Sequence, residues 1–347
     1  MEPIPQDRIA TRDARGRPLR DLRISVIDRC NFRCTYCLPA DRFGPGHAFL
    51  PRESLLGDDE LETIVRVAVR LGVEKIRLTG GEPLLRPGIV GLVERLAAID
   101  GLTDLALTTN GTHLARLAPA LAAAGLSRVT VSLDALDDET FGRMNGVGAK
   151  VQPVLEGIDA AARAGLSPLK VNMVVRRGVN EGAIVPMAER FRGTGICLRF
   201  IEYMDVGETN GWRADQVVPG AEIVARIAAS IHPLVPAAPS RSGEVARRWR
   251  YADGSGEIGI VASISEPFCG TCNRARLTAD GSLFTCLFAS RGHDVRAALR
   301  RDGAAGVERL LSEVWAGRDD RYSELRGTTP LQQVAPAPKV EMSRVGG

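Results

Sequence analysis

Three closely spaced cysteines are the residues of this chain best suited to do chemistry. Cys30, Cys34 and Cys37 follow the pattern Cys-x3-Cys-x2-Cys, and three thiolates on one short loop can hold a single soft metal centre. A cubane iron–sulfur cluster has one more iron than this loop has cysteines, so one iron would stay free to bind a substrate or cofactor directly. A zinc site with His47 as a further ligand is the alternative. The odd count of seven cysteines in 347 residues argues against a disulfide framework, and the isolated Cys197 is expected to be a small buried hydrophobe.

A second cysteine group lies near the other end of the chain. Cys269, Cys272 and Cys286 have the pattern Cys-x2-Cys-x13-Cys, and the close pair is typical of an intracellular metal site. The third cysteine is expected on a strand over Leu283–Phe288. Either a second iron–sulfur cluster or a zinc site completed by His293 would satisfy this pattern.

Several positive charges stand where burial is costly unless the side chain faces a ligand or a partner. Arg274 and Arg276 alternate beside the second cysteine group, and a guanidinium fork matches phosphate oxygens, although a solvated basic strand is the alternative. Lys75 and Arg77 share one face of a predicted strand, which we expect to face the interior of the fold. The same argument applies to Arg23 and Arg199, which also lie on predicted strands.

The composition limits the class of protein. A content of 44% hydrophobic and 25% charged residues is typical of a globular protein, and the net charge of +3 is too balanced to predict nucleic-acid binding. No apolar run approaches the ~20 residues of a membrane span. Free thiols and the lack of a recognisable secretory signal favour a reducing, cytoplasmic compartment. Residues 1–20 carry five arginines and no apolar stretch, so they are expected to form a flexible basic arm.

Strand and helix patterns alternate from residue 22 to about residue 202. Six strand–helix units predict an α/β fold with a parallel sheet that curls into a partial (β/α)6 TIM-like barrel. A module with the second cysteine group would close its open side. The predicted strands are 22–27, 75–79, 104–109, 128–133, 169–175, 196–202 and 258–264, and the predicted helices are 58–71, 86–99, 113–124, 151–164, 181–191 and 219–229.

Polar residues follow these strands at the carboxyl ends, where parallel α/β proteins bind ligands. The first cysteine loop follows the first strand, and Gly-Gly-Glu-Pro at 80–83 follows the second. Asn110 follows the third strand, Ser132 ends the fourth and Met204 follows the sixth. Their shared position predicts one binding site at this end of the barrel.

These motifs together resemble a known family. The first cysteine loop followed by Gly-Gly-Glu-Pro resembles the radical S-adenosylmethionine superfamily. The second group, within the run Cys-Gly-Thr-Cys-Asn-Arg-Ala-Arg at 269–276, is similar to the MoaA-type GTP 3′,8-cyclase family of molybdenum-cofactor (molybdopterin) biosynthesis, and so is the double glycine at 346–347. The resemblance runs from about Arg20 to Phe288 and resumes at the tail, whereas residues 302–340 carry no motif of the family.

The resemblance implies a lyase with two [4Fe–4S] clusters, one on each cysteine group. The first would bind S-adenosylmethionine and, with one electron, release a 5′-deoxyadenosyl radical. That radical would take the C3′ hydrogen of GTP, and C3′ would attack guanine C8 while the guanine is bound to the second cluster. The product would be (8S)-3′,8-cyclo-7,8-dihydroguanosine 5′-triphosphate, which a cyclic pyranopterin monophosphate synthase would then consume.

The resemblance also carries roles onto matching positions. The S-adenosylmethionine contacts would be Tyr36, Gly81, Glu82, Asn110, Ser132 and Met204. The GTP contacts would be Arg23, Lys75, Arg77, Thr108, Lys170, Arg199, Arg274 and Arg276, and the tail residues Gly346 and Gly347 would reach into the active site.

The expected organisation has four parts: the arm at 1–20, the barrel at 21–235, the second cluster module at 236–340 and the tail at 341–347. Expected partners are GTP, a one-electron donor such as flavodoxin or ferredoxin, and the downstream synthase. The chain would act as a monomer or homodimer, without nucleic acid or membrane. Two alternatives stay open: a peptide-modifying radical enzyme with an auxiliary cluster, which would need more cysteines, and a non-catalytic binding protein stapled by zinc.

Overall fold

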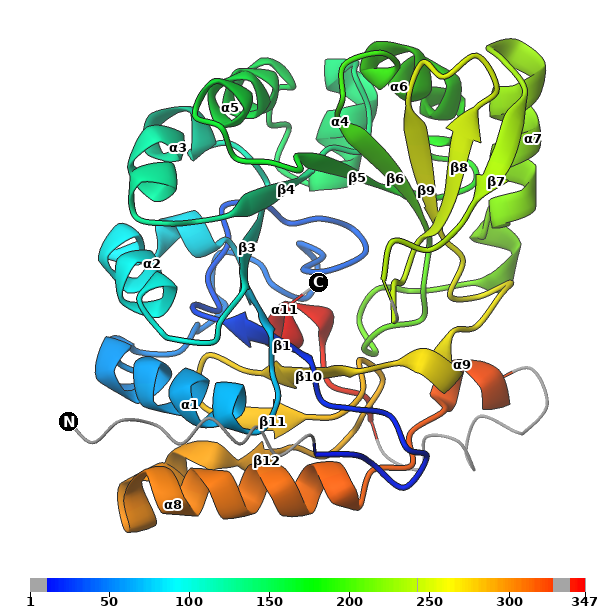
Figure 1. Cartoon of the computed structure of the whole chain (residues 1–347). Coiled ribbons are helices and arrows are strands. Elements are labelled where there is room, and N and C mark those ends of the chain that lie inside the picture. Colours follow the sequence, from blue (N-terminus) through cyan, green and yellow to red (C-terminus); the bar gives the residue numbers. More distant parts are fainter. Residues whose placement is uncertain (1–10, 242, 327–337, 347) are drawn as a thin grey trace.

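A computed structural model describes residues 11–241, 243–326 and 338–346 (Figure 1). Its strands form a curved sheet around a central space, and helices cover the outer side of the curve (Figure 1). Residues 1–10 of the expected basic arm lie outside the described residues. The expected division into four parts stays a prediction.

Six parallel strands form the middle of the sheet, which confirms the predicted partial barrel. Each strand neighbours the next in chain order, and helices on the outside return the chain between them (Figure 1). The strands are β1 (Asp21–Ser25), β2 (Lys75–Thr79), β3 (Asp104–Thr109), β4 (Arg128–Ser132), β5 (Lys170–Val175) and β6 (Cys197–Glu202). The helices are α1 (Asp58–Arg70), α2 (Ile89–Ala97), α3 (Leu114–Ala123), α4 (Asp138–Asn145), α5 (Gln152–Arg163) and α6 (Ile184–Phe191).

The sheet continues beyond both edges of this six-stranded core. On one side β10 (Arg274–Leu277) pairs parallel with β1, followed by the antiparallel β11 (Ser282–Phe284) and β12 (His293–Asp294). On the other side β9 (Glu257–Val261) pairs parallel with β6, followed by the antiparallel β8 (Arg247–Tyr251) and β7 (Leu234–Ala237). The remaining α-helices of the described residues are α7 (Gly220–Ser230), α8 (Val295–Ala316), α9 (Tyr322–Leu325) and α11 (Met342–Val345). The second cysteine group therefore lies beside β1.

Strand β2 shows how the sequence directs side chains to the two faces of the barrel wall. Ile76 and Leu78 are fully buried in the main hydrophobic core. Lys75 and Arg77 alternate with them and line the cavity inside the barrel, which confirms the predicted orientation. The core thus lies between strands and helices, and it leaves the inner face of the sheet for polar chemistry.

The local structure differs from the predictions around α4 and around Cys286. Helix α4 was not predicted, because its eight residues contribute few buried apolar side chains, chiefly Phe141 and Met144, and its start depends on the Asp137 cap that accepts from the Thr140 amide at 2.7 Å. Cys286 does not lie on a strand, because β11 ends at Phe284 and the chain turns there.

The structure describes residues 11–20 of the expected arm. Residues 11–20 pack against the rest of the fold, where Asp13, Arg17 and Leu19 are buried. The Leu19 amide donates to the Thr11 carbonyl at 3.1 Å, and the Gly16 amide donates to the Asp13 carbonyl at 2.9 Å, which closes a tight turn between them. The high arginine content misled the prediction, since Arg17 is paired inside the protein rather than solvated. No helix within the described ranges is both long and apolar enough to cross a membrane.

Candidate active site

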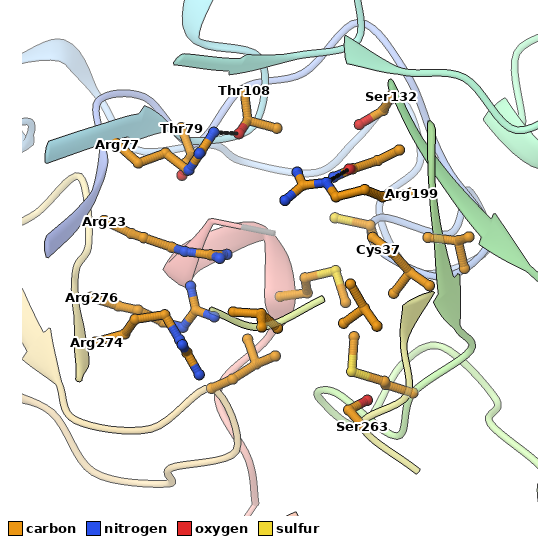
Figure 2. Close-up of a pocket in the computed structure, with 18 of the residues that line it drawn as sticks. Arg23, Cys37, Arg77, Thr79, Thr108, Ser132, Arg199, Ser263, Arg274 and Arg276 are labelled. Atoms are coloured by element: carbon orange, nitrogen blue, oxygen red, sulfur yellow. Dashed lines mark hydrogen bonds between the residues drawn. The ribbon is translucent and has the colours of Figure 1, made fainter. Parts of the chain in front are cut away.

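Both cysteine groups line one cavity of about 300 Å³ inside the barrel. Twenty of the 22 residues predicted for the site line it; Gly346 and Gly347 do not appear in the lining, and Gly347 lies outside the described residues. Figure 2 shows the side chains of Arg23, Arg274 and Arg276 pointing into the same space from one wall, with Cys37 and Ser132 across from them. The fold thus gathers the predicted residues, whose individual roles stay predictions.

The first cysteine loop holds three thiols close to one another. Burial raises the pKa of Cys30 to about 11, and burial followed by the neighbouring thiols raises the pKa of Cys34 and Cys37. The Phe32 amide donates to the Cys30 sulfur at 3.3 Å. A positively charged metal centre would counteract both effects on these pKa values, because it stabilises buried thiolates that otherwise repel one another. This donor set therefore fits a soft metal centre.

The histidines of the zinc alternative lie elsewhere. The His47 ring packs between Phe43 and Phe49, with ring centroids 4.8 Å apart in both pairs, and His293 is exposed on β12. Neither is among the described residues that line the cavity. Within the described ranges, no group of three or more His, Cys, Asp or Glu side chains is placed to hold a metal ion as it stands.

The Gly-Gly-Glu-Pro loop packs directly against the first cysteine loop. A Cβ on Gly81 would lie 2.2 Å from the Arg29 carbonyl oxygen, so only glycine allows this approach. Glu82 is buried and accepts hydrogen bonds from the Thr109 hydroxyl at 2.7 Å and the Asn110 amide at 2.8 Å. It therefore ties the end of β2 to the end of β3, beside the cysteines.

Substitution of Glu82 by glutamine should flatten the pH dependence of stability. Burial raises the pKa of Glu82 to about 7 from an ordinary 4.5, so the folded chain keeps a proton that the unfolded chain loses. Folding stability should fall by on the order of 3 kcal/mol as the pH rises between these values, and this contribution should be absent from Glu82→Gln. Thermal unfolding of the metal-free chains at pH 5 and pH 8 measures the difference. Glu94→Gln, at an exposed position on α2, is the control, and equal pH dependence in all three proteins would contradict the prediction.

One contact between two polar residues at the site was not predicted from the sequence. The Tyr36 hydroxyl donates to the Asp134 carboxylate at 2.9 Å, and the Val174 amide donates to the same carboxylate at 2.8 Å. Burial raises the pKa of Asp134 to about 6. The available signal was position, since Asp134 follows the fourth strand as the other polar residues follow theirs. This pair fixes the tyrosine that precedes Cys37.

The opposite wall carries several cations with few partners. Arg77 donates to the Thr108 and Thr130 hydroxyls at 2.9 and 3.2 Å, whereas the buried Nε of Arg23 has no partner among the described residues. Burial, followed by repulsion from Arg23, lowers the pKa of Arg77 to about 9. Burial lowers the pKa of Lys170 to about 8. An anionic ligand would relieve this repulsion, so the wall is suited to phosphate groups.

Lys75 differs from the other predicted GTP contacts. It lines the cavity but forms a buried ion pair with Asp21, which also lines the cavity. Burial lowers the pKa of Lys75 even though Asp21 opposes this shift. Its charge is therefore already neutralised, and we expect it to contribute less to anion binding than Arg23 or Arg77.

The second cysteine group has a more basic setting than the first. Burial alone would raise the pKa of Cys272, but the neighbouring Arg274 and Arg318 bring it below its ordinary value. Burial raises the pKa of Cys286 to about 12. The Arg274 guanidinium also stacks over the Phe268 ring at 5.4 Å. These three cavity-lining thiols form a second donor set that fits a soft metal centre.

The C-terminal tail reaches the basic wall. Figure 1 shows α11 inside the ring of strands, and the Gly346 carbonyl accepts a hydrogen bond from Arg276 at 3.0 Å. Glu341 holds the start of the tail by accepting from the Glu208 amide at 3.0 Å and the Thr209 hydroxyl at 2.8 Å. The tail is therefore anchored on both sides of α11.

Cys197 is not the fully buried hydrophobe that we expected. It is partly exposed at the start of β6, and burial raises the pKa of its thiol. It is absent from the described lining of the cavity.

Comparisons with known proteins agree with this arrangement. Residues 24–191 match the Radical SAM superfamily, and residues 196–324 match the family Molybdenum Cofactor Synthesis C. A protein of Xanthomonas axonopodis pv. citri named GTP 3′,8-cyclase is 54% identical over 96% of this chain and 98% of its own. Proteins of the same name from Acidothermus cellulolyticus and Staphylococcus epidermidis are 52% and 44% identical, over 97% and 100% of this chain and 99% and 100% of their own.

A solved structure shares the fold at low sequence identity. The crystal structure of Streptococcus suis SuiB bound to S-adenosylmethionine has a TM-score of 0.62 and 14% identity, and covers 90% of this chain and 69% of that one. At this identity the likeness shows the fold alone.

Proposed function

Since this chain belongs to the GTP 3′,8-cyclase family of radical S-adenosylmethionine enzymes, we propose that it catalyses the first step of molybdenum-cofactor biosynthesis, the cyclisation of GTP. The observation that supports this most is the cavity itself. Two sets of three cysteines and a wall of unneutralised arginines line one space in the barrel, although they come from distant parts of the sequence. Neither a purely structural metal site nor a simple nucleotide site needs this combination.

The two cysteine sets would each hold a [4Fe–4S] cluster. When bound, the first cluster and S-adenosylmethionine supply a carbon radical that abstracts hydrogen, and the second cluster supplies an open iron for the guanine. The protein's part is to place and shield the reactants. Glu82 and the Tyr36–Asp134 pair fix the edges of the first loop, and the buried walls of the barrel exclude water.

The basic wall would bind the triphosphate. Arg77 and Arg276 are buried beside the partly buried Arg23, and burial followed by repulsion from Arg23 lowers the pKa of both. A triphosphate would offset their repulsion, which a neutral nucleoside cannot do. The proposal therefore predicts that the phosphates of GTP contribute much of its binding.

The expected partners belong to the same proposal. A small electron carrier such as flavodoxin or ferredoxin would deliver one electron, and a cyclic pyranopterin monophosphate synthase would take the product. A cytoplasmic location and a monomer or homodimer also stay predictions.

A product assay tests the function. The reconstituted chain is incubated without oxygen with S-adenosylmethionine, a strong reductant and either GTP or ATP, and products are identified by mass. With GTP, we expect 5′-deoxyadenosine and an isomer of GTP. With ATP, we expect no isomer of ATP and no turnover coupled to it. If 5′-deoxyadenosine formed while GTP stayed unchanged, the substrate assignment would be wrong. If iron-loaded protein formed no 5′-deoxyadenosine, the radical chemistry itself would be refuted.

A further inference from the structure

A buried cluster of charges lies behind the second cysteine group. It consists of Asp13 and Arg17 from the first described segment and Arg318, which follows α8. Their side chains are 0%, 3% and 1% exposed, respectively. Burying two guanidinium groups is costly unless they meet partners that need them, so this cluster calls for a function.

The two arginines hold the backbone of all three cysteine segments. Arg17 Nη1 donates to the Cys269 carbonyl at 2.7 Å, and Arg318 Nη1 donates to the Cys272 carbonyl at 2.9 Å. Arg318 Nε donates to the carbonyl of Thr285, the residue before Cys286, at 3.1 Å. The third segment has no strand partner at this point, since β11 has already ended. Hydrogen bonds from the two arginines, rather than pairing between strands, therefore hold the backbone of this loop in place.

Asp13 fixes the orientation of both arginines. Its carboxylate accepts from Arg17 Nε at 2.6 Å and from Arg318 Nη1 at 3.0 Å. Trp315 completes the frame, because the Arg318 guanidinium lies over its ring at 4.6 Å and its Nε1 donates to the Arg17 carbonyl at 3.0 Å. The positions of these donors are thus set before any ligand binds.

The cluster keeps a surplus of positive charge and an unused donor. Two guanidinium groups face one fully buried carboxylate. Among the described residues, the one further acid paired with them is Asp320, which is 30% exposed and lies 3.1 Å from Arg318 Nε. The buried Nη2 of Arg17 has no partner among the described residues. Buried donors are nearly always satisfied, so a free one beside a cysteine segment points to an acceptor that binds there. A negatively charged, sulfur-rich centre would be such an acceptor.

We propose that Arg17 and Arg318 are positioning residues of the second iron–sulfur centre: they hold its three cysteine segments through backbone carbonyls and set its reduction potential with their charge. This inference rests on the proposed function only in assuming that the second cysteine group binds a cluster. Positive charge beside a cluster stabilises its reduced form, because that form carries one more negative charge. The potential should therefore fall when the charge is removed.

The test compares Arg318→Met, Arg318→Lys and Arg17→Lys in the full-length, reconstituted chain. Measured quantities are iron per chain, the electron paramagnetic resonance spectrum of the reduced protein and the midpoint potential of each centre. Formation of 5′-deoxyadenosine depends on the first cysteine group, so it reports whether the rest of the site is intact. Arg309→Met is the matched control, since Arg309 is exposed on α8 and pairs with Asp302 of the same helix.

We expect Arg318→Met to lose up to half of its iron, or to keep it with a lowered potential and an altered spectrum of the second centre. Both lysine variants keep the charge but lose the guanidinium fork, so the spectrum should change while the potential stays near that of the wild type. All variants should still form 5′-deoxyadenosine. If Arg318→Met does not fold, the lysine variants that fold provide the test.

The inference is overturned if the folded variants keep full iron, with the spectrum and potential of the second centre unchanged. Equal loss of both centres would also overturn it, because the cluster would then be a general structural element. Failure of the proposed function looks different: the wild-type chain itself would make no cyclised GTP, whatever the spectra of the variants show.

Discussion

Replacing Cys34 with serine should abolish the formation of 5′-deoxyadenosine. Cys34 is the middle cysteine of the first loop, and its thiol lies near those of Cys30 and Cys37, which raise its pKa together with burial. A serine hydroxyl does not ionise at neutral pH and is a poor ligand for iron, so the loop should no longer hold a metal centre with an open position. Iron per chain and 5′-deoxyadenosine, measured by mass without oxygen, give the result.

The control for this variant is Cys197→Ser. It removes the one cysteine outside both groups, and its side chain is absent from the described lining of the cavity, so iron content and turnover should be unchanged. Retained cleavage of S-adenosylmethionine in Cys34→Ser would refute the assignment of the first loop. Loss of activity in both variants would instead point to a general sensitivity of the fold to these substitutions.

The parts of this fold that follow from local sequence could be predicted closely. The predicted ranges of β2 and β3 match the structure residue for residue, because alternating and apolar runs bounded by turn residues define a buried strand. Both cysteine groups were recognised for the same reason, since closely spaced ligands carry their geometry in the spacing. The polar residues that were predicted to follow parallel strands line one cavity, because all such strands end at the same side of the barrel.

Contacts between distant segments could not be predicted in this way. Arg17 and the Cys269 carbonyl that it holds are 252 residues apart, and no local pattern distinguishes this arginine from solvated ones nearby. The segment around it looked like a flexible arm because burial depends on the Asp13 and Arg318 partners rather than on hydrophobicity. The pairing of Lys75 with Asp21 is a second contact of this kind, and the predicted role of Lys75 in binding GTP stays a prediction.

The first cysteine loop and the opposite wall of the cavity carry ionisable groups of opposite charge. The first cysteine loop is flanked by acids, Glu82 and Asp134, whose pKa values burial raises to about 7 and about 6. The opposite wall carries arginines whose pKa values burial lowers. A cationic group of a ligand near the first loop would stabilise the ionised carboxylates, and a polyanionic ligand would stabilise the charged arginines, which agrees with two different molecules meeting in the cavity.

Deleting Gly346 and Gly347 should reduce cyclisation of GTP by on the order of 100-fold while 5′-deoxyadenosine still forms. The Gly346 carbonyl accepts from Arg276, an arginine of the basic wall, so the end of the tail lies where the substrate would be positioned. Met342 and the buried Val345 stay in the shortened chain, and Glu341 keeps its contacts with the loop after β6, so the fold and both cysteine groups should persist. Iron content, 5′-deoxyadenosine and cyclised nucleotide measured on one sample separate these effects.

Gly346→Ala tests the same position without shortening the chain. Gly346 has φ +71°, and an added Cβ would lie 1.7 Å from the Thr79 hydroxyl, so alanine must displace the end of the tail. We expect the cyclised product to fall in this variant too, because a small displacement of a positioning group is enough to slow an oriented reaction. Arg344→Gln is the control: its half-exposed side chain pairs with Asp280 at 2.8 Å, and an ion pair of this kind contributes little. Unchanged turnover in both glycine variants would remove the tail from catalysis, whereas joint loss of iron and product would show that the tail supports the fold instead.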